Sequence, residues 1–453
     1  MTRILDLIGH TPIVQTQHLD TGKCSLFLKL ENQNPGGSIK DRMARSMIDE
    51  AEKSGALKPG GLIVEATAGN TGLGLALIAS QRGYKLTLVI PDKMSQEKIQ
   101  HLRALGAEVI LTRSDVGKGH PEFYSDKAKA IAKATPGAFF ADQFSNPSNP
   151  DAHEATTGPE IWEQMEHKVD AVVAGAGTGG TITGIARYLK KVSPQTEIIL
   201  ADPKGSVLAA AANKQPWPAP GSYLVEGIGQ DYVPDNLDLS LLTKGYTVDD
   251  EESINTAQQL LLKEGILAGS SSGTLIAAAL RYCHEQTTPK RVVTFVCDSG
   301  NKYLSKIYNR FWLNDQGLLH EPAQDSLADL ISRSFRRGEV VSIKPSDTLQ
   351  AAFAKMKMYD VSQLPVIEEG KLLGIIDETD LLLAVTDSAG GFTRKVQEAM
   401  TSRVETVDVR QKPHDLPPLF RKGHVGVIMD KDQFLGLITP IDLLNYLRKR
   451  NAA

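Results

Sequence analysis

Short apolar runs rich in β-branched residues alternate with stretches of helical periodicity over roughly the first 310 residues. The runs that predict strands are GLIVEA, KLTLVIP, AEVILT, DAVVAGAG, EIILAD and RVVTFVCD. Helical patterns include TGLGLALIASQRG, SQEKIQHLRALG and TITGIARYLKKV. This alternation predicts an α/β fold in which helices cover both faces of a parallel sheet. Ligands of such sheets bind where the carboxyl ends of the strands and the following loops converge.

The pattern changes at WLNDQGLLHEPAQDS, where Gly, Pro and Asp indicate a linker. We therefore expect a first domain over residues 1–315, a linker over 316–326 and a second domain over 327–453. The second domain contains a tandem repeat, with copies at about 327–386 and 396–450. GIIDETDLL and GLITPIDLL, which begin at Gly374 and Gly436, share five of nine positions.

Composition and charge narrow the classes of partner. The 54 acidic and 50 basic residues leave a formal charge of −4, which gives no electrostatic drive toward nucleic acid or an anionic membrane. Three cysteines without C-x-x-C spacing argue against a disulfide framework and a zinc site. We find no secretory segment and no apolar run near the roughly 18 residues of a membrane span. These features predict a cytoplasmic protein that binds small molecules, without metal, membrane or nucleic acid.

A glycine-rich turn, AVVAGAGTGGTITGIARYL, joins a predicted strand to a helix that begins near Thr181. Bare N–H groups at a helix N-terminus bind phosphate, and glycines allow close approach of the anion. The same glycines match G-x-G-x-x-G, and Asp202 follows at about the distance expected in a dinucleotide fold. A nicotinamide-dependent oxidoreductase therefore remains open, as does a purely structural use of the glycines.

Three further turns place polar residues at predicted helix starts. EATAGNTG and AGSSSG could serve only to cap their helices. In ENQNPGGSIKDRM, Lys40 lies at a helix start, where the helix dipole disfavours a cation. The alternative is a surface lysine beside a capping box of Ser38 and Asp41.

Together the four turns resemble the cysteine synthase and cystathionine β-synthase family. These are pyridoxal-phosphate enzymes with a tryptophan-synthase β-subunit-like fold (fold type II). The resemblance covers about residues 4–310, from LDLIGHTPIV through NPGGSIKDR, EATAGNTG, MSQEKIQHLRALGAEV and GAGTGGT to EGILAGSSSG. It implies a pyridoxal 5'-phosphate cofactor, and we expect no haem because the family start is reached by residue 4.

The resemblance also implies roles for individual residues. Lys40 would form the Schiff base with the cofactor and act as general base, Asn70 would hydrogen-bond the ring oxygen, and Ser271 would face the pyridine nitrogen. The phosphate would be held by Gly177, Thr178, Gly179, Gly180 and Thr181. The amino-acid substrate would be bound by Thr67, Ala68, Asn70, Thr71, Gln143 and Gly227.

The expected reaction is a β-replacement. A neutral serine opposite the pyridine nitrogen makes the ring a weaker electron sink, which favours loss of a β-substituent over transamination. VEGIGQDYVP and the tandem repeat resemble cystathionine β-synthases, which join L-serine and L-homocysteine; hydrogen sulfide production is left open. DQFSNPSNP resembles cysteine synthases equally, and Ala68 and Phe144 depart from the family pattern. Cysteine synthase (O-acetylserine sulfhydrylase) is therefore the alternative.

The repeat resembles paired CBS domains (a Bateman module), which implies an adenosine ligand such as S-adenosylmethionine or an adenine nucleotide. The second repeat matches G-h-h-[ST]-x-x-D with Thr439 and Asp442. The first repeat has Asp377 at the hydroxyl position, where its charge would repel a phosphate. A purely structural dimerisation module is the alternative here, and a non-catalytic nucleotide sensor is the alternative for the whole chain. The family also implies a homodimer.

Overall fold

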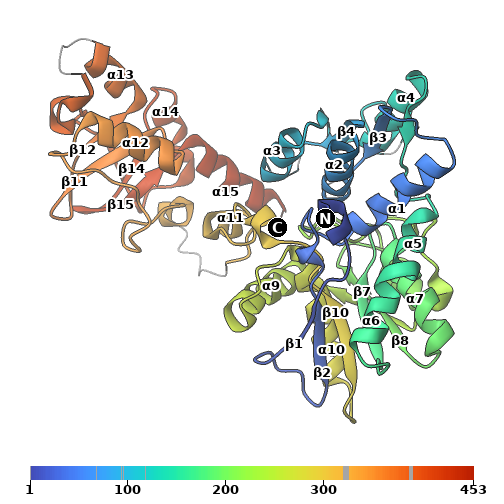
Figure 1. The fold of residues 1–453 in the computed structure, drawn as a ribbon. Helices are drawn as coiled ribbons and strands as arrows, with labels where there is room; N and C mark the ends of the chain where they lie inside the picture. The colour runs from blue at the N-terminus through green and yellow to red at the C-terminus, as the bar shows by residue number, and fades with distance from the viewer. Residues whose placement is uncertain are drawn as a thin grey trace. The chain divides into compact units, whose positions relative to one another are not determined.

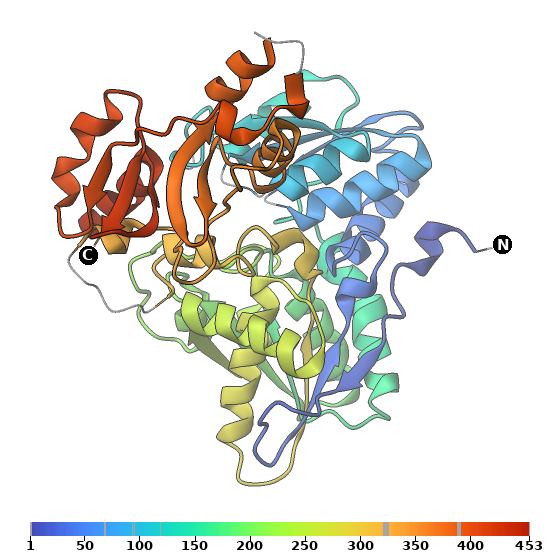
Figure 2. The same cartoon turned by 90° about the vertical axis from the view of Figure 1, so that its left-hand side faces the viewer.

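The computed structural model describes residues 2–67, 69–92, 94, 96–117, 119–319, 326–386 and 391–452. The chain divides into two compact units, Met1–Tyr308 and Asn309–Ala453 (Figures 1 and 2). The domain boundaries expected at 315 and 326 stay predictions, because residues 320–325 lie outside the described part of the chain.

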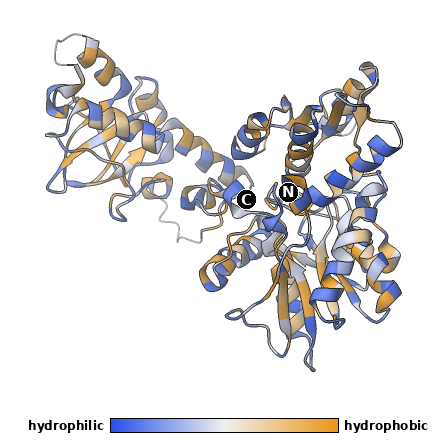
Figure 3. Cartoon of the chain, viewed as in Figure 1, coloured by the Kyte–Doolittle hydropathy of each residue, from blue (hydrophilic) through white to orange (hydrophobic). Residues whose placement is uncertain are grey.

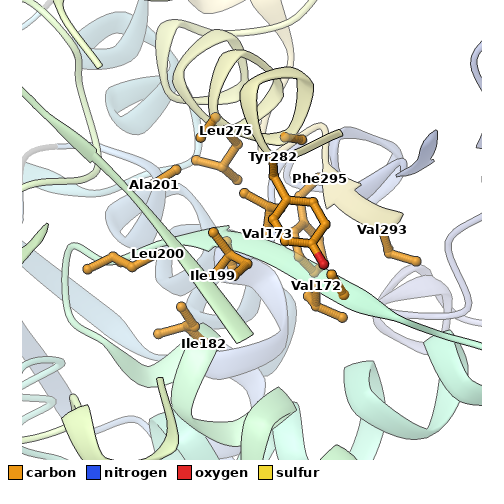
Figure 4. Close-up of a cluster of buried hydrophobic side chains, with 14 of the residues drawn as sticks. Val172, Val173, Ile182, Ile199, Leu200, Ala201, Leu275, Tyr282, Val293 and Phe295 are labelled. Atoms are coloured by element: carbon orange, nitrogen blue, oxygen red, sulfur yellow. The ribbon is translucent and has the colours of Figure 1, made fainter. Parts of the chain in front are cut away.

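A six-stranded sheet forms the larger half of the first unit, in the order β1-β2-β10-β7-β8-β9. Only β1 runs antiparallel to its neighbour. Its central strands are buried on both faces and are almost wholly apolar, as Figure 4 shows for Val172, Val173, Ile199 and Val293. The strands are β1 (Ile13–Gln15), β2 (Ser25–Lys29), β7 (Ala171–Gly175), β8 (Glu197–Pro203), β9 (Lys244–Val248) and β10 (Arg291–Phe295).

A separate four-stranded parallel sheet has the order β5-β4-β3-β6, so the single sheet expected from the sequence is two sheets. The hydropathy pattern of the sequence identifies the segments that form strands, but it does not show which strands pair with one another. Ile63 packs in the cluster with α1 and α2, whereas Val64 packs on the opposite face with Ala128 of α4. The elements are β3 (Leu62–Ala66), β4 (Lys85–Pro91), β5 (Glu108–Thr112), β6 (Phe139–Phe140), α1 (Lys40–Lys53), α2 (Asn70–Arg82), α3 (Gln96–Ala104) and α4 (Tyr124–Ala134).

Helices also cover both faces of the six-stranded sheet, with α6 and α7 on one side and α9 on the other (Figure 1). The apolar strands lie inside and the polar sides of the helices lie outside (Figure 3). A π-helical turn, His153–Thr157, connects α5 to α6. These helices are α5 (Ser148–Ala152), α6 (Gly158–Gln164), α7 (Gly180–Val192), α8 (Leu208–Ala212), α9 (Asp250–Glu264) and α10 (Ser270–His284).

The second unit confirms the predicted tandem repeat. Each copy has an antiparallel hairpin, β11-β12 or β14-β15, with a register shift at the same place, followed by a helix. The opening strand β13 of the second copy corresponds to a single bridge between Ile343 and Val366 in the first. The elements are α11 (Arg310–Asp315), α12 (Leu349–Tyr359), β11 (Gln363–Glu368), β12 (Lys371–Asp377), α13 (Glu378–Thr386), β13 (Thr406–Asp408), α14 (Pro417–Phe420), β14 (Gly426–Asp430), β15 (Gln433–Ile438) and α15 (Pro440–Ala452). Within the described residues, no helix has the length and apolar character needed to cross a membrane.

Candidate active site

Most helices of the first unit whose N-cap is described begin without a side-chain cap, and four of them follow the turns singled out in the sequence. Among the described residues, α1, α2, α7 and α10 have no side-chain hydrogen bond at the N-cap. By contrast, Asp249 caps α9 and Thr348 caps α12. Capping was the alternative for the turns before α2 and α10, and it is wrong. The first N–H groups of an α-helix have no intrahelical partner, so a helix start can bind an anion. In α1 the Lys40 N–H donates to Ser38 Oγ at 3.2 Å, and in α7 the Gly180 N–H donates to Thr178 Oγ1 at 3.5 Å.

The loop after β10 joins three of these helix starts. Asp298 forms a backbone bridge with Ser38, just before α1. Its Oδ2 accepts from Asn70 Nδ2 at 2.7 Å, at the start of α2. Its carbonyl accepts from the Gly269 N–H at 3.3 Å, at the start of α10. Residues far apart in sequence therefore meet at the carboxyl end of β10, as expected for a parallel sheet.

Hydrogen bonds connect the fourth helix start to the same region. Thr71 Oγ1 donates to Gln143 Oε1 at 2.6 Å. Asn149 Nδ2 donates to the Gln143 carbonyl at 2.8 Å and to Thr178 Oγ1 at 2.9 Å. The structure thus brings together the turns at 67–71 and 177–181 through Asn149, a residue that the sequence did not single out. Ala68 lies outside the described residues.

Lys40 is half-buried at the start of α1. Burial lowers the pKa of its amine, although the neighbouring Cys297 and Asp298 partly oppose that effect. Within the described residues, Lys40 Nζ has no hydrogen-bond or ion-pair partner. The capping-box alternative is wrong, because the Asp41 carboxylate accepts from the Gly36 N–H at 2.5 Å instead of capping with Ser38. A lowered pKa favours the neutral amine that a nucleophile requires.

The turn before α7 is shaped as an anion site. Gly179 has a φ of +83°, a left-handed conformation that favours glycine. A side chain at Gly180 would collide with the Asn149 amide, and one at Gly177 would lie 2.5 Å from the Gly227 carbonyl. Thr181 Oγ1 lies 3.2 Å from His153 Nε2 on the π-helical turn. This cradle fits a phosphate group.

Ser271 is almost fully buried in the first turn of α10. The Ser271 and Ser272 hydroxyls lie in hydrogen-bonding reach of the Cys297 thiol, and Cys297 N donates to Ser272 Oγ at 2.9 Å. Burial raises the pKa of Cys297 to about 12, so the thiol is neutral. Two neutral groups therefore lie at this part of the site.

Gln143 already makes hydrogen bonds with several partners. Its Nε2 donates to the Ala66 carbonyl at 3.0 Å and to Glu65 Oε1 at 3.3 Å, while its Oε1 accepts from Thr71. Burial raises the pKa of Glu65 to about 8. Glu65 is therefore protonated at neutral pH and adds no negative charge beside the expected carboxylate site. Thr67 is also buried here, and its Oγ1 accepts from the Gly69 N–H at 3.1 Å.

A buried ion-pair cluster, missed from the sequence, adjoins the expected substrate residue Gly227. Lys98 Nζ donates to Glu226 Oε2 at 2.5 Å, and Lys306 Nζ donates to Glu226 Oε1 at 2.6 Å. Burial alone would raise the pKa of Glu226, but the two lysines outweigh it and lower the pKa. The sequence signal that could have predicted this ion pair is the presence of a lysine in MSQEKIQ and of a glutamate in VEGIGQDYVP. Gly227 has a φ of +91° and open space around its α-carbon.

In the second unit, Thr439 and Asp442 are bonded to each other. Asp442 Oδ2 accepts from the Thr439 N–H at 2.7 Å and from its hydroxyl at 2.5 Å. Asp377 and Asp380 form the matching pair, with backbone-to-carboxylate bonds of 3.1 and 2.8 Å. The local role of both pairs is to cap α15 and α13. An adenosine role for Thr439 and Asp442 stays a prediction.

The nicotinamide alternative fits the structure poorly. Asp202 is fully buried, and its Oδ2 accepts from the Ala209 N–H at 2.8 Å, so the carboxylate is committed to the fold. The unpaired Lys40 amine and the uncapped cradle before α7 instead fit the aldehyde and the phosphate of pyridoxal phosphate. The fold and the site together define a pyridoxal-phosphate enzyme.

Comparison with known proteins leads to the same class. The family described as "pyridoxal-phosphate dependent enzyme" matches residues 4–298, and the CBS domain matches residues 328–387. A cystathionine β-synthase of Apis mellifera is 37% identical over 467 residues, covering 100% of this chain and 92% of the relative. That of Saccharomyces cerevisiae is 37% identical over 494 residues, covering 98% and 97%. The chain belongs to the cystathionine β-synthase family of pyridoxal-phosphate dependent enzymes.

Two further similarities are confined to part of the chain. Cysteine synthase A of Escherichia coli is 45% identical over 303 residues, covering 66% of this chain and 92% of the relative. The crystal structure of a hydrogen sulfide-producing enzyme from Fusobacterium nucleatum has a TM-score of 0.63 and 38% identity, covering 67% of this chain and 100% of that one. The predicted fold class, enzyme class and cofactor are confirmed.

Proposed function

We propose that this chain joins L-serine and L-homocysteine to give L-cystathionine and water. Relatives named cystathionine β-synthase match this chain across both units, which supports this substrate pair. The observation that carries the chemistry is Lys40, a half-buried amine of lowered pKa at the start of α1, where the loop after β10 also meets the starts of α2 and α10. In the reaction the Cβ–O bond of serine breaks and a Cβ–S bond forms, while the hydroxide and the thiol proton leave as water.

Lys40 has two tasks in this proposal. Its amine would hold the aldehyde of pyridoxal phosphate, and when an amino acid takes that place the freed amine removes the α-proton. The same amine later returns a proton to the α-carbon of the product. The lowered pKa serves both tasks, because only a neutral amine attacks a carbonyl or accepts a proton.

Other residues would hold the cofactor and the substrate. The bound cofactor supplies an electron sink for the α-carbon. The turn from Gly177 to Thr181 would bind its phosphate, Asn70 its ring oxygen, and Ser271 would meet the ring nitrogen. The neutral Ser271 and Cys297 place no carboxylate there, which supports β-replacement over transamination.

We propose that Thr67, Ala68, Asn70, Thr71, Gln143 and Gly227 receive the amino-acid substrate. Gln143 would exchange its present bonds to Ala66 and Glu65 for the substrate carboxylate. Gln143→Ala should therefore raise the KM for serine more than it lowers kcat, as steady-state kinetics would show. An unchanged KM for serine would remove Gln143 from this role.

Product analysis tests the substrate pair. The enzyme is incubated with serine plus homocysteine, and in parallel with O-acetylserine plus sulfide, and the amino acids are separated by liquid chromatography. Cystathionine formed at the faster rate supports the proposal. Cysteine as the dominant product would instead establish a cysteine synthase, the second candidate, which the 45% identity to cysteine synthase A favours. Sulfide released from cysteine plus homocysteine would show hydrogen sulfide production as a further activity.

The second unit is proposed to bind an adenosine compound, S-adenosylmethionine first, through Thr439 and Asp442. A ribose diol can give the Asp442 carboxylate two hydrogen bonds in place of those from Thr439. Calorimetry on the whole chain should show that Asp442→Ala weakens binding about ten-fold or more, and more than Asp380→Ala does. Absence of binding by S-adenosylmethionine, AMP and ATP would contradict a sensor role.

We also propose a homodimer in the cytoplasm. The dimer is inferred from the family, and sedimentation analysis would test it. A reducing compartment suits Cys24, Cys283 and Cys297, which are all free thiols.

A further inference from the structure

Two charged residues of the segment after β10 hold the Asn70 amide from both sides. Asn70 Nδ2 donates to Asp298 Oδ2 at 2.7 Å, and Asn70 Oδ1 accepts from Lys302 Nζ at 2.9 Å. Asp298 is fully buried, and Lys302 is 8% exposed. The site residue thus depends on two side chains more than 220 positions away in sequence.

The chemistry of these partners fixes which way the amide points. An ammonium group only donates hydrogen bonds, and an ionised carboxylate only accepts them. Asp298 Oδ2 also accepts from the Tyr303 hydroxyl at 2.6 Å, so both hydrogen bonds to this oxygen are ones that it accepts. The amide oxygen must therefore face Lys302 and the amide nitrogen must face Asp298. Within the described residues, the second N–H of Asn70 has no hydrogen-bond partner.

Lys302 also connects Asn70 to the segment that carries the nucleophile. Its Nζ donates to the Gly36 carbonyl at 3.2 Å and to the Gly37 carbonyl at 3.0 Å. These glycines lie in the turn that leads to Lys40 at the start of α1. One ammonium group therefore sets the position of the Asn70 amide relative to the Lys40 turn.

We propose that Lys302 and Asp298 are positioning residues that hold Asn70 in the one orientation that leaves an N–H for the ring oxygen of the cofactor. Burial lowers the pKa of Lys302, and Asp298 opposes that effect. The three acceptors around its Nζ, the Gly36 and Gly37 carbonyls and Asn70 Oδ1, match the three N–H groups of an ammonium. A positive charge beside this amide favours the ring oxygen in its anionic form. This inference rests on the proposed function and extends it to two residues that need not touch the cofactor.

The test measures binding to the apoenzyme rather than turnover. Quenching of tryptophan fluorescence gives the Kd of pyridoxal phosphate and of 3-deoxypyridoxal phosphate, which lacks the ring oxygen. In Lys302→Met we expect the affinity for pyridoxal phosphate to fall about ten-fold or more, and that for the deoxy analogue to change less than about two-fold. Lys302→Gln keeps a hydrogen-bond donor without the charge, so its affinity for pyridoxal phosphate should fall less than that of Lys302→Met. Lys290→Met is the matched control, because Lys290 pairs with Glu197 and precedes the opposite end of β10.

A second readout is the pH titration of the absorbance of the bound cofactor. Loss of the nearby ammonium should raise the pKa of the ring hydroxyl in Lys302→Met relative to the parent and to Lys290→Met. A rise of Tm with inorganic phosphate equal to that of the parent shows that a variant is folded at the α7 turn. If Lys302→Met does not fold, Lys302→Gln carries the same comparison.

The outcomes separate this inference from the proposed function. Equal losses for both probes in the Lys302 variants, or no loss for either, would overturn the positioning role while the proposed function stands. A parent enzyme that binds both probes equally would overturn it as well. A parent that binds neither probe would overturn the proposed function, and the positioning role with it.

Discussion

At the scale of single residues, the first unit places ionisable groups in surroundings that change their charge. Burial lowers the pKa of Lys40 and raises that of Glu65 to about 8, so both groups tend toward the neutral form. Burial also lowers the pKa of Lys302, but Asp298 opposes that effect, and the two side chains hold Asn70 between them. Burial therefore favours the neutral forms of Lys40 and Glu65, while the buried Lys302 and Asp298 hold Asn70 beside them.

Replacing the nucleophile should abolish the reaction. In Lys40→Ala we expect β-replacement to fall at least about a thousand-fold, because the change removes both the attacking amine and the base. Reduction with borohydride in the presence of pyridoxal phosphate, followed by peptide mass analysis, should mark Lys40 in the parent and nothing at this position in the variant. Near-normal turnover by Lys40→Ala would contradict the assignment.

Glu65 should make the stability of the fold depend on pH. The folded state keeps a proton on Glu65 up to about pH 8, whereas the unfolded chain releases it near 4.5. This contribution to stability is full below pH 4.5 and is lost as the pH rises to about 8. Because one pKa unit corresponds to about 1.4 kcal/mol, the loss over this range is on the order of 5 kcal/mol.

Glu65→Gln removes this titration while keeping an oxygen that accepts from Gln143. Urea unfolding at pH 5 and at pH 8 should show a smaller loss of unfolding free energy in the variant than in the parent. The same pH dependence in both proteins would show that Glu65 is already ionised in the fold.

At the scale of elements, the start of α7 carries the most demanding geometry. A methyl group at Gly180 would collide with Asn149, which bridges Gln143 and Thr178. Gly180→Ala should destabilise the fold by about 1–3 kcal/mol. It should also weaken the binding of inorganic phosphate and of pyridoxal phosphate, as calorimetry would show.

Gly117→Ala is the control for this change, because a side chain at Gly117 meets no atom within 4 Å. It should leave both stability and phosphate affinity unchanged. Equal phosphate affinity in Gly180→Ala and the parent would place the phosphate elsewhere.

Elements were predicted from the sequence where they are long and buried. The runs that became β3, β4, β7, β8 and β10 were recognisable because strands buried on both faces are continuously apolar. The strands β1 and β6, with three and two residues, carry too little pattern to detect. The division into two sheets could not be predicted either, because the apolar pattern of a strand does not show which other strand it pairs with.

The candidate site shows the same limit. Lys40 and the glycine turns were recognisable because each breaks a local rule for helix starts, and the family resemblance supplied the roles. Asp298 and Lys302 were missed because their segment is ordinary in composition, and their partner Asn70 lies on another sheet's helix. Contacts between distant segments were predictable only where family motifs already implied them.

At the scale of the whole molecule, the two proposed binding sites lie in separate units. Unit Met1–Tyr308 holds the site around Lys40, and unit Asn309–Ala453 holds the repeat with Thr439 and Asp442. A ligand stabilises the unit that binds it by mass action. At 100-fold excess over Kd this amounts to about 2.7 kcal/mol.

Scanning calorimetry of the whole chain should therefore resolve different effects of the two ligands. Pyridoxal phosphate should raise the Tm of the transition that is lost or weakened in Gly180→Ala, and an adenosine ligand should raise the Tm of the transition sensitive to Asp442→Ala. If each ligand shifted both transitions equally, the two units would unfold as one cooperative body.

The pairing of β2 with β10 also bears on how the enzyme is made. Ser25 lies opposite Arg291 in the sheet, and Ser38 forms its bridge with Asp298. Lys40 therefore emerges early from the ribosome, whereas the strand β10 and the following loop, which pair with β2 and with Ser38, emerge only after most of the unit has been synthesised. Contacts of such long sequence separation close slowly. We therefore expect the cofactor site to form only after β10 and the loop that follows it have been synthesised.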